Sequence, residues 1–208
     1  MVDAICNKLT LKIRARMPEI DDERAEIINY GLQLMIGEIP KTFIILLIAY
    51  LLGVFKISLL VLLIVTPYRA ISGGAHFKTH VECVLATTLF YVGNAFVSQK
   101  FVLENPVQYI LTAITFAFAI YAITRYAPAD TEDVPILRKK ERKIKKILSY
   151  IVMSIMLITS LIIKNTTISN ILLIATFLQS FALTRVMYKI ARNKYGYEEY
   201  IKNNKESI

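Results

Sequence analysis

Four stretches of the sequence contain no charged residue over about the thickness of a membrane. Each stretch is 17 to 20 residues long, and about 20 residues of helix cross a hydrocarbon core of roughly 30 Å. The stretches are 83–99, 105–124, 147–163 and 165–184. Because 55% of the residues are hydrophobic and the mean hydropathy is +0.50, the chain is too apolar for an ordinary soluble domain. The sequence therefore predicts an all-α, polytopic integral membrane bundle.

A fifth apolar run, 42–66, contains a single charge, Lys56. Its length fits either one tilted span or two short helices that turn near Gly53 and Lys56. The positive-inside rule separates the two arrangements, because a single span would place the basic connection 125–146 outside the cell. With a turn, only three of the 25 Lys and Arg lie in the outer connections: Lys56, Lys100 and Lys164. We therefore predict about six membrane-crossing helices with both termini in the cytoplasm.

The polar segments at the two ends are predicted to belong to the same membrane domain, 1–208. Residues 1–40 contain two amphipathic patterns that we expect to form cytoplasmic or interfacial helices. Residues 41–190 form the transmembrane bundle, and 191–208 form a cytoplasmic tail. The formal net charge of +9 would indicate nucleic acid in a soluble protein, but here the basic residues lie between apolar runs. We expect a lipid bilayer as partner and no nucleic acid.

Both histidines and one of the two cysteines lie within eight residues: His76, His80 and Cys83. If a helix begins near residue 75 or 76, the three side chains share one helical face. Either histidine could then take the proton of Cys83, and the thiolate could attack a carbonyl group. The preceding Gly73 and Gly74 break any helix and could offer backbone N–H groups to an oxyanion. Spacing alone does not choose between the two histidines.

Other interpretations of this cluster remain open. Arg69 is a candidate anchor for a substrate carboxylate or a buried structural partner. The two histidines and Cys83 could bind zinc, although Phe77 stands where the H-E-x-x-H pattern has its glutamate, and we predict no metal and no cofactor. The cluster could also be structural, with capping histidines and a packed thiol. Cys6 has no neighbouring histidine, and we expect an ordinary thiol there.

Two motifs give the chain a resemblance to a known family. The first is Arg69-x3-Gly73-Gly74-x-His76-x6-Cys83, and the second is the run from Tyr126 to Ile136, Y-A-P-A-D-T-E-D-V-P-I, which precedes a basic segment. Their order and spacing resemble the accessory gene regulator B family, membrane cysteine endopeptidases of Gram-positive quorum sensing. Together with the hydrophobic layout, the resemblance covers nearly the whole chain.

The resemblance implies specific roles. The nucleophile of the family falls on Cys83 and its histidine on His76, which leaves His80 without a predicted role. The family removes the acidic C-terminal tail of an amphipathic propeptide and holds the remainder as a thioester. An internal Cys or Ser of the peptide then closes a thiolactone or lactone ring. The resemblance also implies a homodimer. The topology predicted from the distribution of Lys and Arg places the cluster of His76 and Cys83 at the cytoplasmic side of the cell membrane.

The basic segment 138–146 has two interpretations. Its lysines and arginines, including Lys139 and Lys140, could set the topology and contact anionic lipids, or they could hold the acidic tail of the substrate. Asp130 could orient His76 as a third catalytic group, although we favour a dyad. Two other functions also fit the sequence: a non-catalytic partner for export or assembly of a small peptide, and a zinc-dependent membrane hydrolase.

Overall fold

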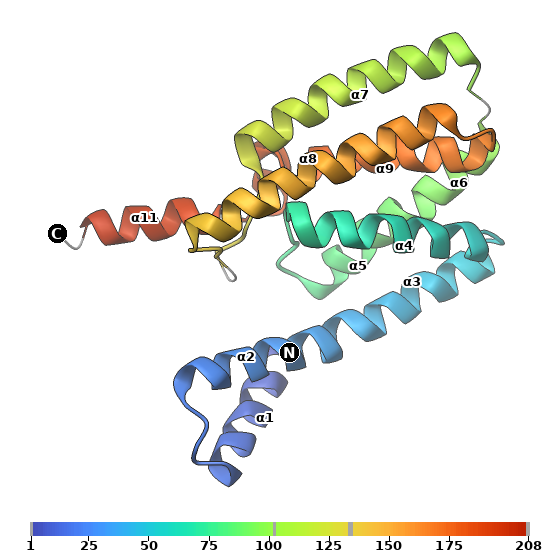
Figure 1. Cartoon of the computed structure of the whole chain (residues 1–208). Coiled ribbons are helices and arrows are strands. Elements are labelled where there is room, and N and C mark those ends of the chain that lie inside the picture. The colour runs from blue at the N-terminus through green and yellow to red at the C-terminus, as the bar shows by residue number, and fades with distance from the viewer. Residues whose placement is uncertain (1, 102, 133–134, 207–208) are drawn as a thin grey trace.

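The computed structural model describes residues 2–101, 103–132 and 135–206, and most of them are helical (Figure 1). In chain order the elements are α1 Val2–Arg16, α2 Asp22–Gln33, η1 Leu34–Glu38, α3 Ile39–Leu51, α4 Phe55–Ser72, α5 His80–Thr88, η2 Leu89–Gly93, α6 Asn94–Lys100, α7 Asn105–Tyr126, α8 Lys139–Ile162, α9 Thr166–Ala182, α10 Arg185–Ile190 and α11 Gly196–Glu206. Both η elements are single π-helical turns that continue the neighbouring α-helices. Within these described residues the extended pairings are two isolated bridges.

The apolar run 42–66 divides into two helices, as predicted. Helix α3 ends at Leu51 and α4 begins at Phe55. Between them Gly53 has a φ of +71°, a left-handed conformation that a residue without Cβ adopts at little cost. Two antiparallel helices therefore replace a single long span.

Five helical stretches are long and apolar enough to cross a membrane. They are Arg24–Leu51, Phe55–Ser72, Val81–Lys100, Pro106–Tyr126 and Lys139–Ile162. The shorter apolar helix α9 has 17 residues, close to the lower limit for a span. These six apolar helices confirm the prediction of an all-α, multi-pass membrane bundle.

Helix α9 lies at the centre of the bundle, where it packs against α4, α6, α7 and α8 (Figure 1). Its buried side chains include small and polar residues, which allow close helix approach and bonding between helices in a membrane. Gln108 of α7, for example, donates to Ser160 O at 2.7 Å and to Ser169 Oγ at 2.6 Å. Large apolar side chains such as Leu89 and Ile158 instead face outward. The bundle thus buries small and polar side chains and exposes large apolar ones, which is the arrangement expected for a protein in lipid.

Helices α1 and α2 form an N-terminal hairpin that stands apart from the bundle (Figure 1). Asn29 of α2 donates to Asn7 of α1 at 2.8 Å. Helix α2 then continues through η1 into α3 without a break, so the predicted boundary at residues 40 and 41 falls inside one continuous helical run. The placement of the hairpin at the membrane interface remains a prediction.

Candidate active site

In the sequence, His76 precedes the start of α5 and Cys83 lies within this helix. The Thr79 hydroxyl caps this helix by accepting a hydrogen bond from Glu82 N at 3.2 Å, so α5 begins at His80 and not near residue 76. The predicted helical face shared by 76, 80 and 83 is therefore wrong. His76 stands instead in the loop before the helix, and that loop brings its Nδ1 to 3.7 Å from Cys83 Sγ.

The loop that carries His76 is fixed by the second sequence motif. Gly74 N donates to Ala129 O at 2.8 Å, and Ala129 N donates to Ser72 O at 2.9 Å. Gly73 has a φ of +75°, and a Cβ on it would lie 2.2 Å from Ala129 O. A glycine is required here by both backbone conformation and space. The two motifs, which are far apart in the sequence, thus meet beside the loop of His76.

Further bonds hold the loop against the bundle. Arg69 donates from Nη2 to Ala75 O at 2.6 Å, and Ala75 N donates to Ala182 O at 3.0 Å. His76 N donates to Asn193 Oδ1 at 2.7 Å. These contacts favour the structural interpretation of Arg69. The prediction of an oxyanion site at the glycines is wrong for this arrangement, because the N–H groups of Gly73 and Gly74 already donate to backbone carbonyls.

Two charged residues that the sequence analysis missed complete the cluster. The Lys41 Nζ of α3 lies 3.5 Å from Cys83 Sγ and forms an ion pair with Glu38. Glu38 Oε1 in turn lies 3.9 Å from His76 Nε2. The only sequence signal was a charged pair, Glu38-x-x-Lys41, at the very start of an apolar run, which is equally typical of a membrane boundary.

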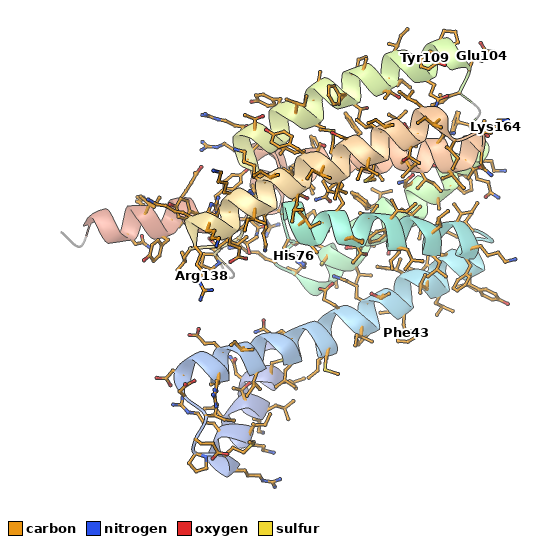
Figure 2. The ribbon with its side chains drawn as sticks, viewed as in Figure 1. Phe43, His76, Glu104, Tyr109, Arg138 and Lys164 are labelled. Carbon is orange, nitrogen blue, oxygen red and sulfur yellow. The ribbon has the colours of Figure 1, made fainter. Side chains whose placement is uncertain are left out.

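The cluster is buried on one side and open on the other. Cys83 is 7% exposed and Lys41 is 4% exposed, whereas the side chain of His76 is 51% exposed. Figure 2 shows His76 at the end of the bundle where α4 ends. The hydroxyl of Thr87, one turn further along the helix, lies 3.9 Å from the Cys83 sulfur. A substrate can therefore approach from the side of His76, while the sulfur is held among protein groups.

This arrangement has the components of a thiol–imidazole pair. The imidazole of His76 is placed to exchange a proton with Cys83, and its second nitrogen faces the Glu38 carboxylate. The ammonium group of Lys41 can stabilise negative charge on the sulfur. Nucleophile, base and a group that orients the base form the general pattern of covalent catalysis.

Asp130 is engaged elsewhere. Its Oδ2 lies 2.9 Å from Arg142 Nη1 and accepts hydrogen bonds from Ile136 N at 2.8 Å and Tyr197 N at 3.1 Å. The Tyr188 hydroxyl donates to Asp130 O at 3.0 Å, and burial raises the pKa of Tyr188, which keeps this donor protonated. The Asp130 contacts join the loop after α7 to the C-terminal segment and favour a structural role.

The other predicted site residues lie outside this cluster, or their side chains are not among those that the structure describes. Lys139 and Lys140 begin α8 as exposed side chains, and the described contacts do not bring them to His76 or Cys83. His80 begins α5, but its side chain is not among those described. Cys6 is buried in α1, and neither cysteine forms a disulfide. Among the side chains that are described, no group of three or more His, Cys, Asp and Glu is arranged to hold a metal ion.

Comparisons with known proteins give a consistent result. The family model of accessory gene regulator B matches residues 6–183. The chain is 28% identical over 182 residues to an AgrB-like protein of Listeria monocytogenes serotype 4a, covering 86% of this chain and 87% of the relative. It is also 28% identical over 182 residues to an AgrB-like protein of Clostridium acetobutylicum, covering 86% and 85%. An AgrB-like protein of Clostridium perfringens is 26% identical over 150 residues, 70% of each chain. No solved structure gives a significant match.

Proposed function

The chain belongs to the accessory gene regulator B family, a multi-pass membrane family of the agr quorum-sensing system, and we propose that it is a cysteine endopeptidase that cleaves and cyclises a signalling propeptide. The catalytic residues in this proposal are Cys83 and His76. The product is a thiolactone or lactone peptide. No cofactor takes part.

One observation carries the proposal. Cys83 Sγ lies 3.7 Å from His76 Nδ1 and 3.5 Å from Lys41 Nζ. A Cys–His pair supplies a nucleophile and a base at neutral pH without a metal. The burial of the sulfur and the exposure of His76 give the pair one open side for a peptide.

The reaction has two acyl-transfer steps. Cys83 passes its proton to His76, and the thiolate attacks the carbonyl carbon at the junction between the ring segment and the acidic tail. The C–N bond breaks, the leaving amine takes the proton from His76, and the ring segment stays on Cys83 as a thioester. An internal Cys or Ser of the propeptide then attacks the thioester, passes its proton to His76 and closes the ring, and Cys83 recovers a proton as it leaves. The thioester conserves the free energy of the acyl group, so ring closure needs no separate energy source.

Glu38 and Lys41 support this chemistry as positioning residues. The Lys41 ammonium group lies beside the sulfur, and the Glu38 carboxylate lies 3.9 Å from His76 Nε2, where it orients the imidazole. Because Glu38 and Lys41 also pair with each other, one ion pair contacts both members of the dyad. The neutral tautomer with its proton on Nε2, toward the carboxylate, leaves Nδ1 free to accept the proton of Cys83.

The proposed topology places both termini and the active site on the cytoplasmic side of the cell membrane. Its support is the distribution of Lys and Arg. A homodimer follows from the family resemblance alone. In this orientation Lys139 and Lys140 lie at the same membrane surface as His76, where they raise the local concentration of an acidic propeptide tail. Figure 2 shows Arg138 at the start of the same basic helix, α8.

Mass spectrometry of a cognate propeptide tests the proposal directly. The full-length protein in liposomes should yield the free tail together with a cyclic product or a thioester-linked enzyme. Cys83→Ala should yield neither, while still binding the propeptide. Cys6→Ala is the matched control, because it removes the other thiol and should retain most activity.

The other outcomes distinguish the alternatives. Normal processing by Cys83→Ala would exclude the thiol mechanism. An intact propeptide that co-purifies with the wild-type protein would favour a non-catalytic partner in export or assembly. Loss of cleavage with a chelator would favour the zinc-dependent hydrolase. A membrane-impermeant thiol reagent applied from outside intact cells should not modify Cys83, and modification would contradict the proposed orientation.

A further inference from the structure

A cavity of about 350 Å³ lies where α7 ends, α8 begins and the C-terminal segment crosses them. Four cations line it, from both helices: Arg125, Arg142, Lys143 and Lys146. The other lining residues include three tyrosines, Tyr126, Tyr195 and Tyr197, and one carboxylate, Glu198. None of the active-site side chains lines this cavity. It is therefore a separate basic site.

The cations of this cavity differ in how fully they are used. Arg142 is held by Asp130 and stacks on Tyr197 with its guanidinium carbon 4.3 Å from the ring centroid. The Lys146 ammonium donates to Thr124 O. Arg125 and Lys143 are exposed, and in the described part of the chain no carboxylate is placed against either. The cavity thus retains an excess of positive charge that would attract an anion from outside the protein.

Among the described residues that line the cavity there is one carboxylate, and it is already paired. Glu198 accepts two hydrogen bonds from Arg185, at 3.0 and 3.2 Å. Arg185 comes from α10, outside the lining. An anion that enters the cavity therefore meets the cations without strong repulsion from Glu198.

The position of the cavity identifies the anion. Helix α7 is a candidate span that ends at Tyr126, and α8 becomes apolar after Lys146. The cavity therefore lies at the depth of lipid headgroups, which is also where tyrosines concentrate. Along α8, exposed isoleucines continue from Lys143 at helical spacing: Ile147, Ile151, Ile155 and Ile158. This stripe offers an acyl chain a path that starts at the basic cavity.

We propose that this cavity binds the phosphate group of an anionic phospholipid, with an acyl chain along the isoleucine stripe of α8. Arg125 and Lys143 provide the charged contacts that the fold does not already use. Basic pockets between transmembrane helices at a membrane surface recognise anionic headgroups by this combination of charge and adjacent apolar surface. An acidic peptide tail without an apolar segment would use the charges but not the isoleucine stripe, so the lipid uses more of the observed surface. This inference does not depend on the proposed catalytic activity.

Native mass spectrometry of the delipidated full-length protein in detergent tests the proposal. Titration with phosphatidylglycerol should show one tightly bound molecule, and phosphatidylcholine with the same chains should bind at least about tenfold more weakly. Arg125→Gln combined with Lys143→Gln should lower the affinity for phosphatidylglycerol at least about tenfold. The control is Arg138→Gln with Lys189→Gln, which removes two exposed cations outside the cavity and should change affinity less than about twofold.

Several results would overturn the assignment. Equal losses in the two double variants would mean diffuse electrostatic attraction and no built site. Competition by glycerol phosphate at concentrations similar to those of the lipid would identify a free-anion site. Displacement of the bound lipid by a short acidic peptide at lower concentration than glycerol phosphate would identify a peptide-tail site. Lys143→Gln alone, at an exposed position, keeps the test valid if the double variant does not fold, and it should lower affinity by at least about threefold.

Discussion

Two carboxylate–cation pairs at the helix connections of this protein are used in different ways. In the Asp130–Arg142 pair, the carboxylate side chain is 1% exposed and also accepts two backbone N–H bonds. In the Glu38–Lys41 pair, the carboxylate side chain is 42% exposed and its partners are side chains, among them His76 and, through Lys41, the sulfur of Cys83. A pair enclosed by backbone donors stabilises a fold, whereas a pair that faces a nucleophile can act on a reaction.

The largest expected effect is on propeptide cleavage, at the histidine that faces the Glu38–Lys41 pair. His76→Ala should lower propeptide cleavage by about 10²- to 10⁴-fold, the range typical of removing a general base. Its thermal midpoint should stay near that of the wild type, because the exposed imidazole contributes little packing. Single-turnover cleavage in liposomes measures the first quantity, and fluorescence-detected unfolding measures the second. Wild-type cleavage by the variant would assign the base to another residue.

The second prediction concerns the Asp130–Arg142 pair, where we expect a loss of stability. Asp130→Ala leaves Arg142 without its carboxylate partner and two backbone N–H groups without their acceptor, and the loss of one member of a buried ion pair costs about 3 kcal/mol. The thermal midpoint in detergent should fall clearly. Lys194→Ala breaks an exposed pair with Glu199 and should cost at most about 1 kcal/mol. A loss of cleavage in Asp130→Ala with unchanged stability would indicate that Asp130 acts in catalysis after all.

A third prediction concerns the contact of Gly73 with Ala129, which joins the loop of His76 to the loop after α7. Gly73→Ala places a Cβ 2.2 Å from Ala129 O at a φ of +75°, which should cost at least about 2 kcal/mol. Because the same contact positions the loop of His76, cleavage should fall together with the thermal midpoint. Gly31→Ala in α2 is the matched control, since its Cβ would meet nothing within 4 Å and alanine favours a helix. Unchanged unfolding in Gly73→Ala would show that the two loops are not coupled.

The helical architecture could be predicted because it depends on patterns along the chain. Charge-free runs give the spans, and the distribution of basic residues favours a turn near Gly53. The family resemblance, and not the spacing, singled out His76 with Cys83, and the structure places these two side chains 3.7 Å apart. The geometric expectation was wrong. The residues share no helical face, because the Thr79 cap delays the start of α5.

The contacts of Lys41 and Glu38 could not be predicted, because they depend on how α3 packs against α5. A charged residue at the edge of an apolar run normally anchors a span in the headgroup region, and nothing local distinguishes Lys41 from Lys56 in this respect. The contact of Gly73 with Ala129 could not be predicted either, because two membrane spans separate these residues in the sequence. Tertiary packing, and not local pattern, decides which charges become part of a site.

The smallest of the expected effects tests whether the Glu38–Lys41 pair acts on the sulfur. Lys41→Met keeps the buried aliphatic stem and removes the cation 3.5 Å from Cys83 Sγ. The thiolate then loses one of its two neighbouring cations, so the rate of Cys83 alkylation by iodoacetamide should fall several-fold, and cleavage should fall by about tenfold. Lys56→Met is the control, because this exposed lysine in the first turn of α4 should change neither rate. Stability should change little, because Glu38 is exposed enough to be solvated without its partner. An unchanged alkylation rate would mean that Lys41 serves only the ion pair, and the two carboxylate–cation pairs would then both be structural.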